Sequence, residues 1–104
     1  MNNDAKDYLM DLLDPYKEYI QIINEKCDII DNHIDKYCAD IQFTNKHEDT
    51  QLIHYNVQYY IYSGSIGVSI VSDDEMLQFA IFSESSYYIN KVINSLHLSI
   101  YESE

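Results

Sequence analysis

The sequence predicts a single α+β domain, 1–104, in which an antiparallel β-meander of three or four strands is packed by two N-terminal helices and one C-terminal helix. Two patterns lead to this prediction. Apolar residues recur at intervals of three and four within 4–38 and again after Ser83, which is the period of a helix. Within 53–81 they occupy every second position between short polar turns, which indicates strands. The length of 104 residues is that of one domain.

The apolar stripe of 4–38 is divided by Pro15. Its members lie alternately four and three residues apart, as on one face of a helix. Asp14 suits an N-cap and Pro15 the first helical position. We therefore expect helices over 4–13 and 15–38, with one kinked helix as the alternative. The stripe consists of Leu9, Leu13, Tyr16, Ile20, Ile23, Cys27, Ile30, Ile34 and Tyr37.

Four segments with strand character follow these helices. The odd-numbered residues from Ile53 to Ile61 are apolar or aromatic and should be buried, because alternate side chains of a strand share one face. Ser63-Gly64-Ser65 suits a tight turn between two of the strands. A polar loop, 44–50, separates a short first strand from the others. The expected strands are 41–43, 53–62, 66–71 and 76–82.

A third helix is expected at the end of the chain. Ser83 suits its N-cap, with Glu84 in the first turn, and helical spacing of apolar residues continues from Ile89 to Ile100. The predicted order of elements is therefore α-α-β-β-β-β-α, with the helices on one face of the sheet.

The charge of the chain excludes several kinds of partner. It has 18 acidic residues, six lysines and no arginine, for a formal net charge of −12. Such a chain repels phosphate backbones and anionic membranes, so we expect no direct nucleic-acid or membrane binding. No apolar run reaches the roughly 18 residues of a membrane span, and Met1–Asp4 is acidic where a signal peptide is basic. We expect a cytoplasmic protein, in the host cytosol, whose partner is a basic protein.

No motif for catalysis, metal binding or cofactor binding is found in the sequence. The chain has no C-x-x-C pair, no H-x-x-x-H pair and no G-x-S-x-G motif, so zinc ligands and a nucleophilic serine are not indicated. Cys27 and Cys38 would lie roughly 16 Å apart along one helix, which is too far for a disulfide. We therefore expect no catalytic, cofactor or metal site, and a protein that is not an enzyme.

Carboxylates form a second stripe on the expected helices, opposite the apolar one. Glu18 lies about 200° around the helix from Ile20, so the two stripes face away from each other. Like charges at these spacings cost roughly 0.2–0.5 kcal/mol per pair, and only Lys17 and Lys36 relieve the repulsion. We infer that a basic partner neutralises the stripe. It consists of Asp4, Asp7, Asp11, Asp14, Glu18, Glu25, Asp28 and Asp35, widened by Asp31.

The expected partner-binding surface combines most of this stripe with two tyrosines and an acidic turn. Tyr60 and Tyr62 should project from the sheet face opposite the core, where tyrosines contribute contact area at low entropic cost. The alternative is that the C-terminal helix or a second subunit covers this face. The predicted partner-binding residues are Asp11, Asp14, Glu18, Glu25, Asp28, Asp31, Asp35, Tyr60, Tyr62, Asp73, Asp74 and Glu75.

In composition the chain resembles phage and mobile-element inhibitors that occupy the nucleic-acid channels of host defence nucleases. The shared properties are small size, strong acidity and the absence of arginine and of catalytic motifs. The resemblance implies a DNA-mimic-like inhibitor of the anti-CRISPR or anti-restriction type. Two alternatives remain open: an immunity protein or antitoxin that neutralises a basic toxin, and a structural or chaperone-like subunit that self-associates through its helices. Because Ile22 and Ile29 lie well outside the main stripe, the apolar sector of the helix expected over 15–38 is too broad for one sheet face to cover, and we therefore expect a homodimer.

Overall fold

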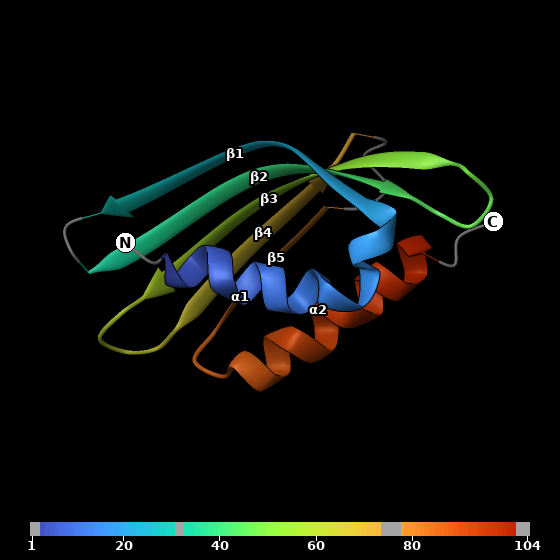
Figure 1. Cartoon of the computed structure of the whole chain (residues 1–104). Coiled ribbons are helices and arrows are strands. Elements are labelled where there is room, and N and C mark those ends of the chain that lie inside the picture. Colours follow the sequence, from blue (N-terminus) through green and yellow to red (C-terminus); the bar gives the residue numbers. More distant parts are fainter. Residues whose placement is uncertain (1–2, 31–32, 74–77, 102–104) are drawn as a thin grey trace.

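The computed structural model describes residues 3–30, 33–73 and 78–101, which form two layers (Figure 1). The predicted α+β class and the antiparallel meander are confirmed, with five strands in place of three or four. Consecutive strands pair antiparallel, so their order in the sheet is the order of the chain. The helical layer contains α1 (Asp4–Leu13), the short 3-10 helix η1 (Asp14–Tyr19) and α2 (Ser86–Tyr101). The sheet contains β1 (Ile20–Ile30), β2 (Ile34–Thr44), β3 (Thr50–Tyr60), β4 (Ile66–Ser72) and β5 (Gln78–Ser83).

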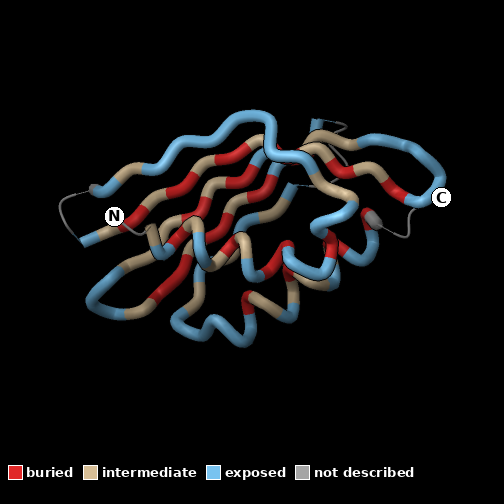
Figure 2. The backbone as a smooth tube through the Cα atoms, viewed as in Figure 1, coloured by how far each residue is buried: buried red, intermediate tan, exposed pale blue. Residues whose placement is uncertain are grey.

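Both α-helices lie on the same face of the sheet, which we call the covered face (Figure 1). Buried and less buried side chains alternate along β2, β3 and β4, as expected for strands with one face in the core (Figure 2). The core between the layers includes Leu9 and Leu13 of α1, Ile53 of β3, and Ile89 and Ile93 of α2, all at most 1% exposed. The opposite face, which we call the open face, carries no helix among the described residues (Figure 1).

The predicted second helix, 15–38, is wrong, because this segment forms η1, β1 and the first part of β2. It is rich in isoleucine, whose branched side chain is restricted in a helix and packs well in a strand. The strand period is hidden by a bulge in β1 between Ile22 and Asn24. The pairing with β2 shows that Ile20 and Ile22 share a face with Cys27, although their numbers differ in parity. The bulge therefore removes the regular alternation by which a strand is recognised in a sequence.

The helix expected over 4–13 is confirmed as α1 with the same bounds, and the expected strand 41–43 is part of the longer β2. The helix expected after Ser83 is confirmed as α2, but its predicted start is wrong, because Ser83 ends β5 and α2 begins at Ser86, beyond Glu84. Three of the five odd-numbered residues expected to be buried in β3 are buried. Tyr59 is half-buried, and Ile61 is 40% exposed because it lies beyond the end of the strand.

Candidate functional site

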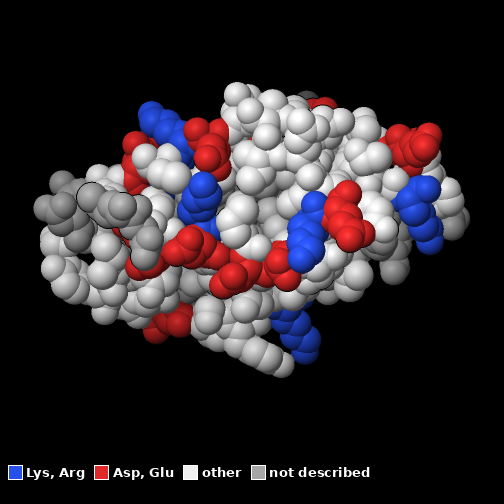
Figure 3. All heavy atoms as spheres, viewed as in Figure 1, with Lys and Arg blue, Asp and Glu red and all other residues white. Residues whose placement is uncertain are grey.

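Five exposed carboxylates follow the outer side of α1 and η1, and we call them the acidic row. α1 begins after Asn3, whose Oδ1 accepts the backbone N–H of Lys6 at 2.8 Å as an N-cap. The helix buries Ala5 and Leu9 against the sheet, so positions on its other side point to solvent. Figure 3 shows the resulting line of acidic side chains over α1. The acidic row consists of Asp4, Asp7, Asp11, Asp14 and Glu18, all exposed.

The charge of the acidic row is not neutralised by the chain itself. Its first two members lie in the first turn of α1, where the helix dipole stabilises a carboxylate. Asp11 and Asp14 lie at the other end, where the dipole disfavours a carboxylate and the last turn has no basic residue. Within the described part of the chain, none of the five carboxylates forms an ion pair.

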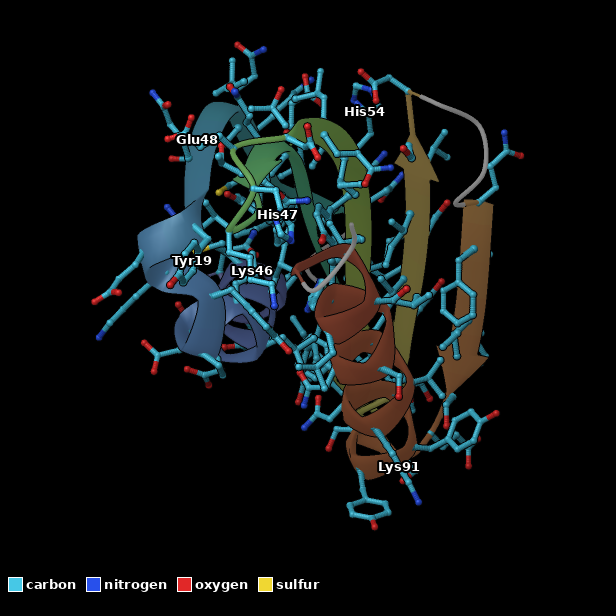
Figure 4. The ribbon with its side chains drawn as sticks, turned by 90° about the vertical axis from the view of Figure 1, so that its right-hand side faces the viewer. Tyr19, Lys46, His47, Glu48, His54 and Lys91 are labelled. Carbon is cyan, nitrogen blue, oxygen red and sulfur yellow. The ribbon has the colours of Figure 1, made fainter. Side chains whose placement is uncertain are left out.

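Some lysines lie on or beside the acidic row, since Lys46 lines the same hollow as Glu18. Lys46 projects from the loop between β2 and β3, and Lys91 projects from α2 into solvent (Figure 4). Only Lys6 and Lys17 belong to the same elements as the acidic row. Lys6 is already engaged, because its Nζ lies 3.3 Å from Oε2 of Glu25 on β1. Lys17 and Lys46 thus lie on or beside the acidic row, but neither forms an ion pair with it among the described residues.

Two further carboxylates of the predicted stripe lie on β1 and do not continue the acidic row. Glu25 and Asp28 are three residues apart in a strand, so their side chains point to opposite faces. Glu25 Oε2 accepts the hydroxyl of Tyr37 at 2.7 Å, and this bond together with Lys6 holds the pKa of the Glu25 carboxyl below its usual value. Asp28 lies on the open face, with an oxygen 3.8 Å from Nζ of Lys26. The expectation that both belong to one stripe is wrong.

Asp35, also predicted to contact a partner, is buried and holds α1 on the sheet. It is only 4% exposed, and its Oδ2 accepts the backbone N–H of Asp4 at 2.9 Å, a donor that has no partner within the helix. Asn3 adds a second link, because its Nδ2 donates to the backbone carbonyl of Lys36 at 3.2 Å. Asp35 is therefore a residue that caps and anchors α1, and it lies inside the molecule.

The two predicted tyrosines lie near each other in sequence but occupy different surroundings. Tyr60 is on the open face, where its ring meets that of Phe82 edge to face at 5.6 Å. Tyr62 lies beyond β3, is 82% exposed, and has its ring 4.8 Å from that of His33. The alternative that the C-terminal helix covers this face is wrong, since α2 packs on the covered face (Figure 1). The open face is thus available for contact, with Tyr60 and Phe82 at one end.

The remaining predicted residues contribute little to the acidic row. Asp73 is exposed just after β4, on a different element. Asp31, Asp74 and Glu75 lie outside the described residues. Of the predicted partner-binding residues, the acidic row thus retains Asp11, Asp14 and Glu18.

A shallow groove crosses the open face, and the sequence analysis did not predict it. Two adjoining hollows of about 430 and 360 Å³ together extend from β1 to β5 and share Asn56 and Ser69 in their lining. Small side chains make the groove possible, among them Cys38, Gly67 and Ala80 on three different strands. Only the register of the five strands brings these residues together, so no local sequence pattern reveals them.

One hollow of the groove contains a cross-strand pair of titratable side chains. Nδ1 of His54 lies 2.6 Å from Oδ1 of Asp40, and this hydrogen bond holds the pKa of Asp40 below its usual value. Asn24 donates to the other carboxylate oxygen at 3.3 Å. Cys38 lines the same hollow, but the described structure has no hydrogen bond between it and His54, such as a nucleophile and its base require. The described residues also contain no cluster of three or more His, Cys, Asp or Glu that could hold a metal ion.

Comparison of the chain with protein-family models, with curated proteins and with solved structures finds no match. In the described part of the chain, no helix is long and apolar enough to cross a membrane.

Proposed function

We propose that this chain is a non-enzymatic inhibitor whose acidic row blocks the basic nucleic-acid-binding groove of a nuclease or effector complex. It would act as a DNA mimic of the anti-CRISPR or anti-restriction type, encoded by a phage or mobile element. The observation that supports this proposal is the acidic row itself, five exposed carboxylates on one helical edge with no ion pair among the described residues.

The spacing of the acidic row suits a partner that binds a charged polymer. Within α1, neighbouring members are three or four residues apart, or about 4.5 to 6 Å along the helix axis. One strand of duplex DNA carries a charge about every 3.4 Å. The acidic row is sparser than a DNA strand, but it also presents charges of one sign along a line. A groove lined by lysine and arginine can follow such a line.

Charge and apolar contact should contribute differently to the complex. Long-range attraction between the acidic row and a basic groove raises the association rate, whereas short-range contacts slow dissociation. Each exposed carboxylate should contribute only about 0–1 kcal/mol, so single substitutions are a weak test. The acidic row has to be tested as a unit.

The two alternatives make different demands on the molecule. Leu9, Leu13, Ile89 and Ile93 direct their apolar side chains into the chain's own core. Self-association through the helices would therefore have to use exposed side chains of α2 such as Tyr87, Tyr88 and Leu98. An immunity protein would also use acidic residues against a basic partner. It would, however, bind one toxin, and duplex DNA would compete only if the toxin itself binds nucleic acid at the same site.

Capture from a bacterial lysate with two matched variants tests the proposal. Each variant removes three negative charges from exposed positions, so the net charge is the same in both. The row variant carries Asp7→Asn, Asp11→Asn and Glu18→Gln. The control variant carries Glu48→Gln, Asp49→Asn and Glu84→Gln.

We expect the wild-type protein on a resin to capture a nucleic-acid-binding protein that added duplex DNA releases. The row variant should lose this capture, and the control variant should keep it. Circular dichroism of all three proteins verifies that they are folded. Equal capture by the row variant and the wild type, or a captured protein that DNA does not release, would contradict the proposal.

A further inference from the structure

We propose that two copies of this chain pair through the free edge of β1, antiparallel about a two-fold axis at Cys27, and form one ten-stranded sheet. This inference is independent of the proposed function, because it concerns a different part of the molecule. Its test uses the purified chain alone.

β1 offers a long, unpaired strand edge. It lies at one end of the sheet, pairs only with β2 among the described strands and has 11 residues. Such an edge is a template for pairing with another chain. The other edge strand, β5, has only six residues and no charged side chain that could fix a register. β1 is therefore the better candidate for specific pairing.

Several apolar side chains of β1 remain exposed although they lie toward the helical side. Ile22 and Ile29 are 37% and 44% exposed, and Cys27 is exposed as well. α1 packs mainly on β2 and β3 and leaves this border of the sheet uncovered. With the axis at Cys27, the Cys27 side chains of both copies lie opposite each other, and Ile29 of each copy lies opposite Glu25 of the other. Pairing would therefore remove part of the apolar surface of Cys27 and Ile29 from water.

The bulge in β1 limits which part of the strand can pair, and this sets the centre of the dimer. From Asn24 to Ile30, β1 pairs residue for residue with β2, whereas the register is irregular between Ile22 and Asn24. The regular part has seven residues, and its midpoint is Cys27. A two-fold pairing that uses all seven positions therefore places Cys27 opposite Cys27 of the second copy.

The charges of β1 favour the same register. With the axis at Cys27, Lys26 of each copy lies opposite Asp28 of the other, which gives two ion pairs on the open face. An axis at Lys26 would place two lysines opposite each other, and an axis at Asp28 would place two aspartates opposite each other. Like charges directly opposite are destabilising in a sheet. The length of the regular part of β1 and the positions of its charged residues therefore each favour the register with Cys27 on the axis.

Charge exchange between the two positions tests this register. We expect the wild type at about 100 μM to sediment with twice the chain mass of 12.3 kDa. Lys26→Asp and Asp28→Lys should each be monomeric, because each places like charges opposite one another. An equimolar mixture of these two variants should form a dimer, since the mixed pair again has opposite charges at both positions.

Crosslinking provides a second readout with a matched control. A short bismaleimide should join two copies of the Cys38→Ser variant through Cys27. It should not join copies of the Cys27→Ser variant, because Cys38 lies on β2 and the two β2 strands would be separated by three strand spacings, roughly 14 Å. Circular dichroism verifies that every variant is folded.

A wild type that sediments at 12.3 kDa would overturn the proposal. So would dimers of the single charge variants as stable as the wild type, since the contact would then lie elsewhere, for example at β5. A monomeric wild type that still captures a DNA-releasable partner would leave the acidic row intact as a functional surface and remove only the dimer.

Discussion

His97 is the buried titratable residue at the centre of the core. It is 0% exposed on α2, and its Nε2 lies 2.7 Å from the hydroxyl of Tyr55 on β3. The rings of Phe43 and Tyr16 lie 5.6 and 5.4 Å from the imidazole. This apolar environment penalises the charged form, so burial lowers the pKa of His97 from 6.5 to about 4. The folded protein therefore contains His97 as a neutral imidazole at neutral pH.

We predict that His97 makes the fold sensitive to mild acid. Because its pKa is lower in the folded than in the unfolded chain, the unfolded chain takes up the proton first. As far as His97 is concerned, the free energy of unfolding is highest above pH 6.5 and decreases as the pH falls toward 4. Between pH 6.5 and about pH 5, the loss in the free energy of unfolding should be about 1.5 kcal/mol.

Urea unfolding at several pH values measures this effect. The other three histidines are the same in wild type and in His97→Gln, so the difference between their pH profiles isolates His97. The variant should be less stable at neutral pH but should lose less stability on acidification. Parallel profiles for the two proteins would show that His97 is not the titrating group.

At the scale of elements, the sequence predicts those segments whose local period is undisturbed. α1 and α2 have regular apolar spacing, and β3 alternates from Ile53 to Val57, so all three were predictable. β1 could not be predicted, because its bulge changes the parity of the apolar positions.

The residues of the candidate site were likewise predictable only where they lie on a segment with an undisturbed local period. The acidic row could be predicted along α1, whereas Glu25, Asp28 and Asp35 were misplaced because they lie on strands, and the groove depends on a register that no single segment contains.

We predict that Asp35 stabilises the attachment of α1 to the β1–β2 hairpin. Asp35→Ala should lower the free energy of unfolding by about 1–3 kcal/mol, because the backbone N–H of Asp4 loses its charged acceptor. Amide exchange in the first turn of α1 should become faster. Asp49→Ala, at an exposed position away from α1, should change stability by less than about 0.5 kcal/mol. Equal stabilities of the two variants, measured by urea unfolding, would exclude the capping role of Asp35.

At the scale of the whole molecule, the two faces of the sheet differ in what covers them. The covered face forms the core and positions the acidic row on the outer side of α1, while the open face and the edge of β1 remain free of helices (Figure 1). A two-fold axis perpendicular to the sheet at Cys27 would place the helices of both copies on the same side. The two acidic rows would then lie on the same side of the ten-stranded sheet.

The association rate with the captured partner tests the central claim, that the acidic row recognises a basic groove. Stopped-flow binding should be measured for wild type, row variant and control variant over a range of ionic strength. We predict that the wild-type and control rates are high at low salt and fall steeply as salt screens the charges. The row variant should associate slowly at every ionic strength. A row variant that associates as fast as the control variant, with the same salt dependence, would contradict the claim.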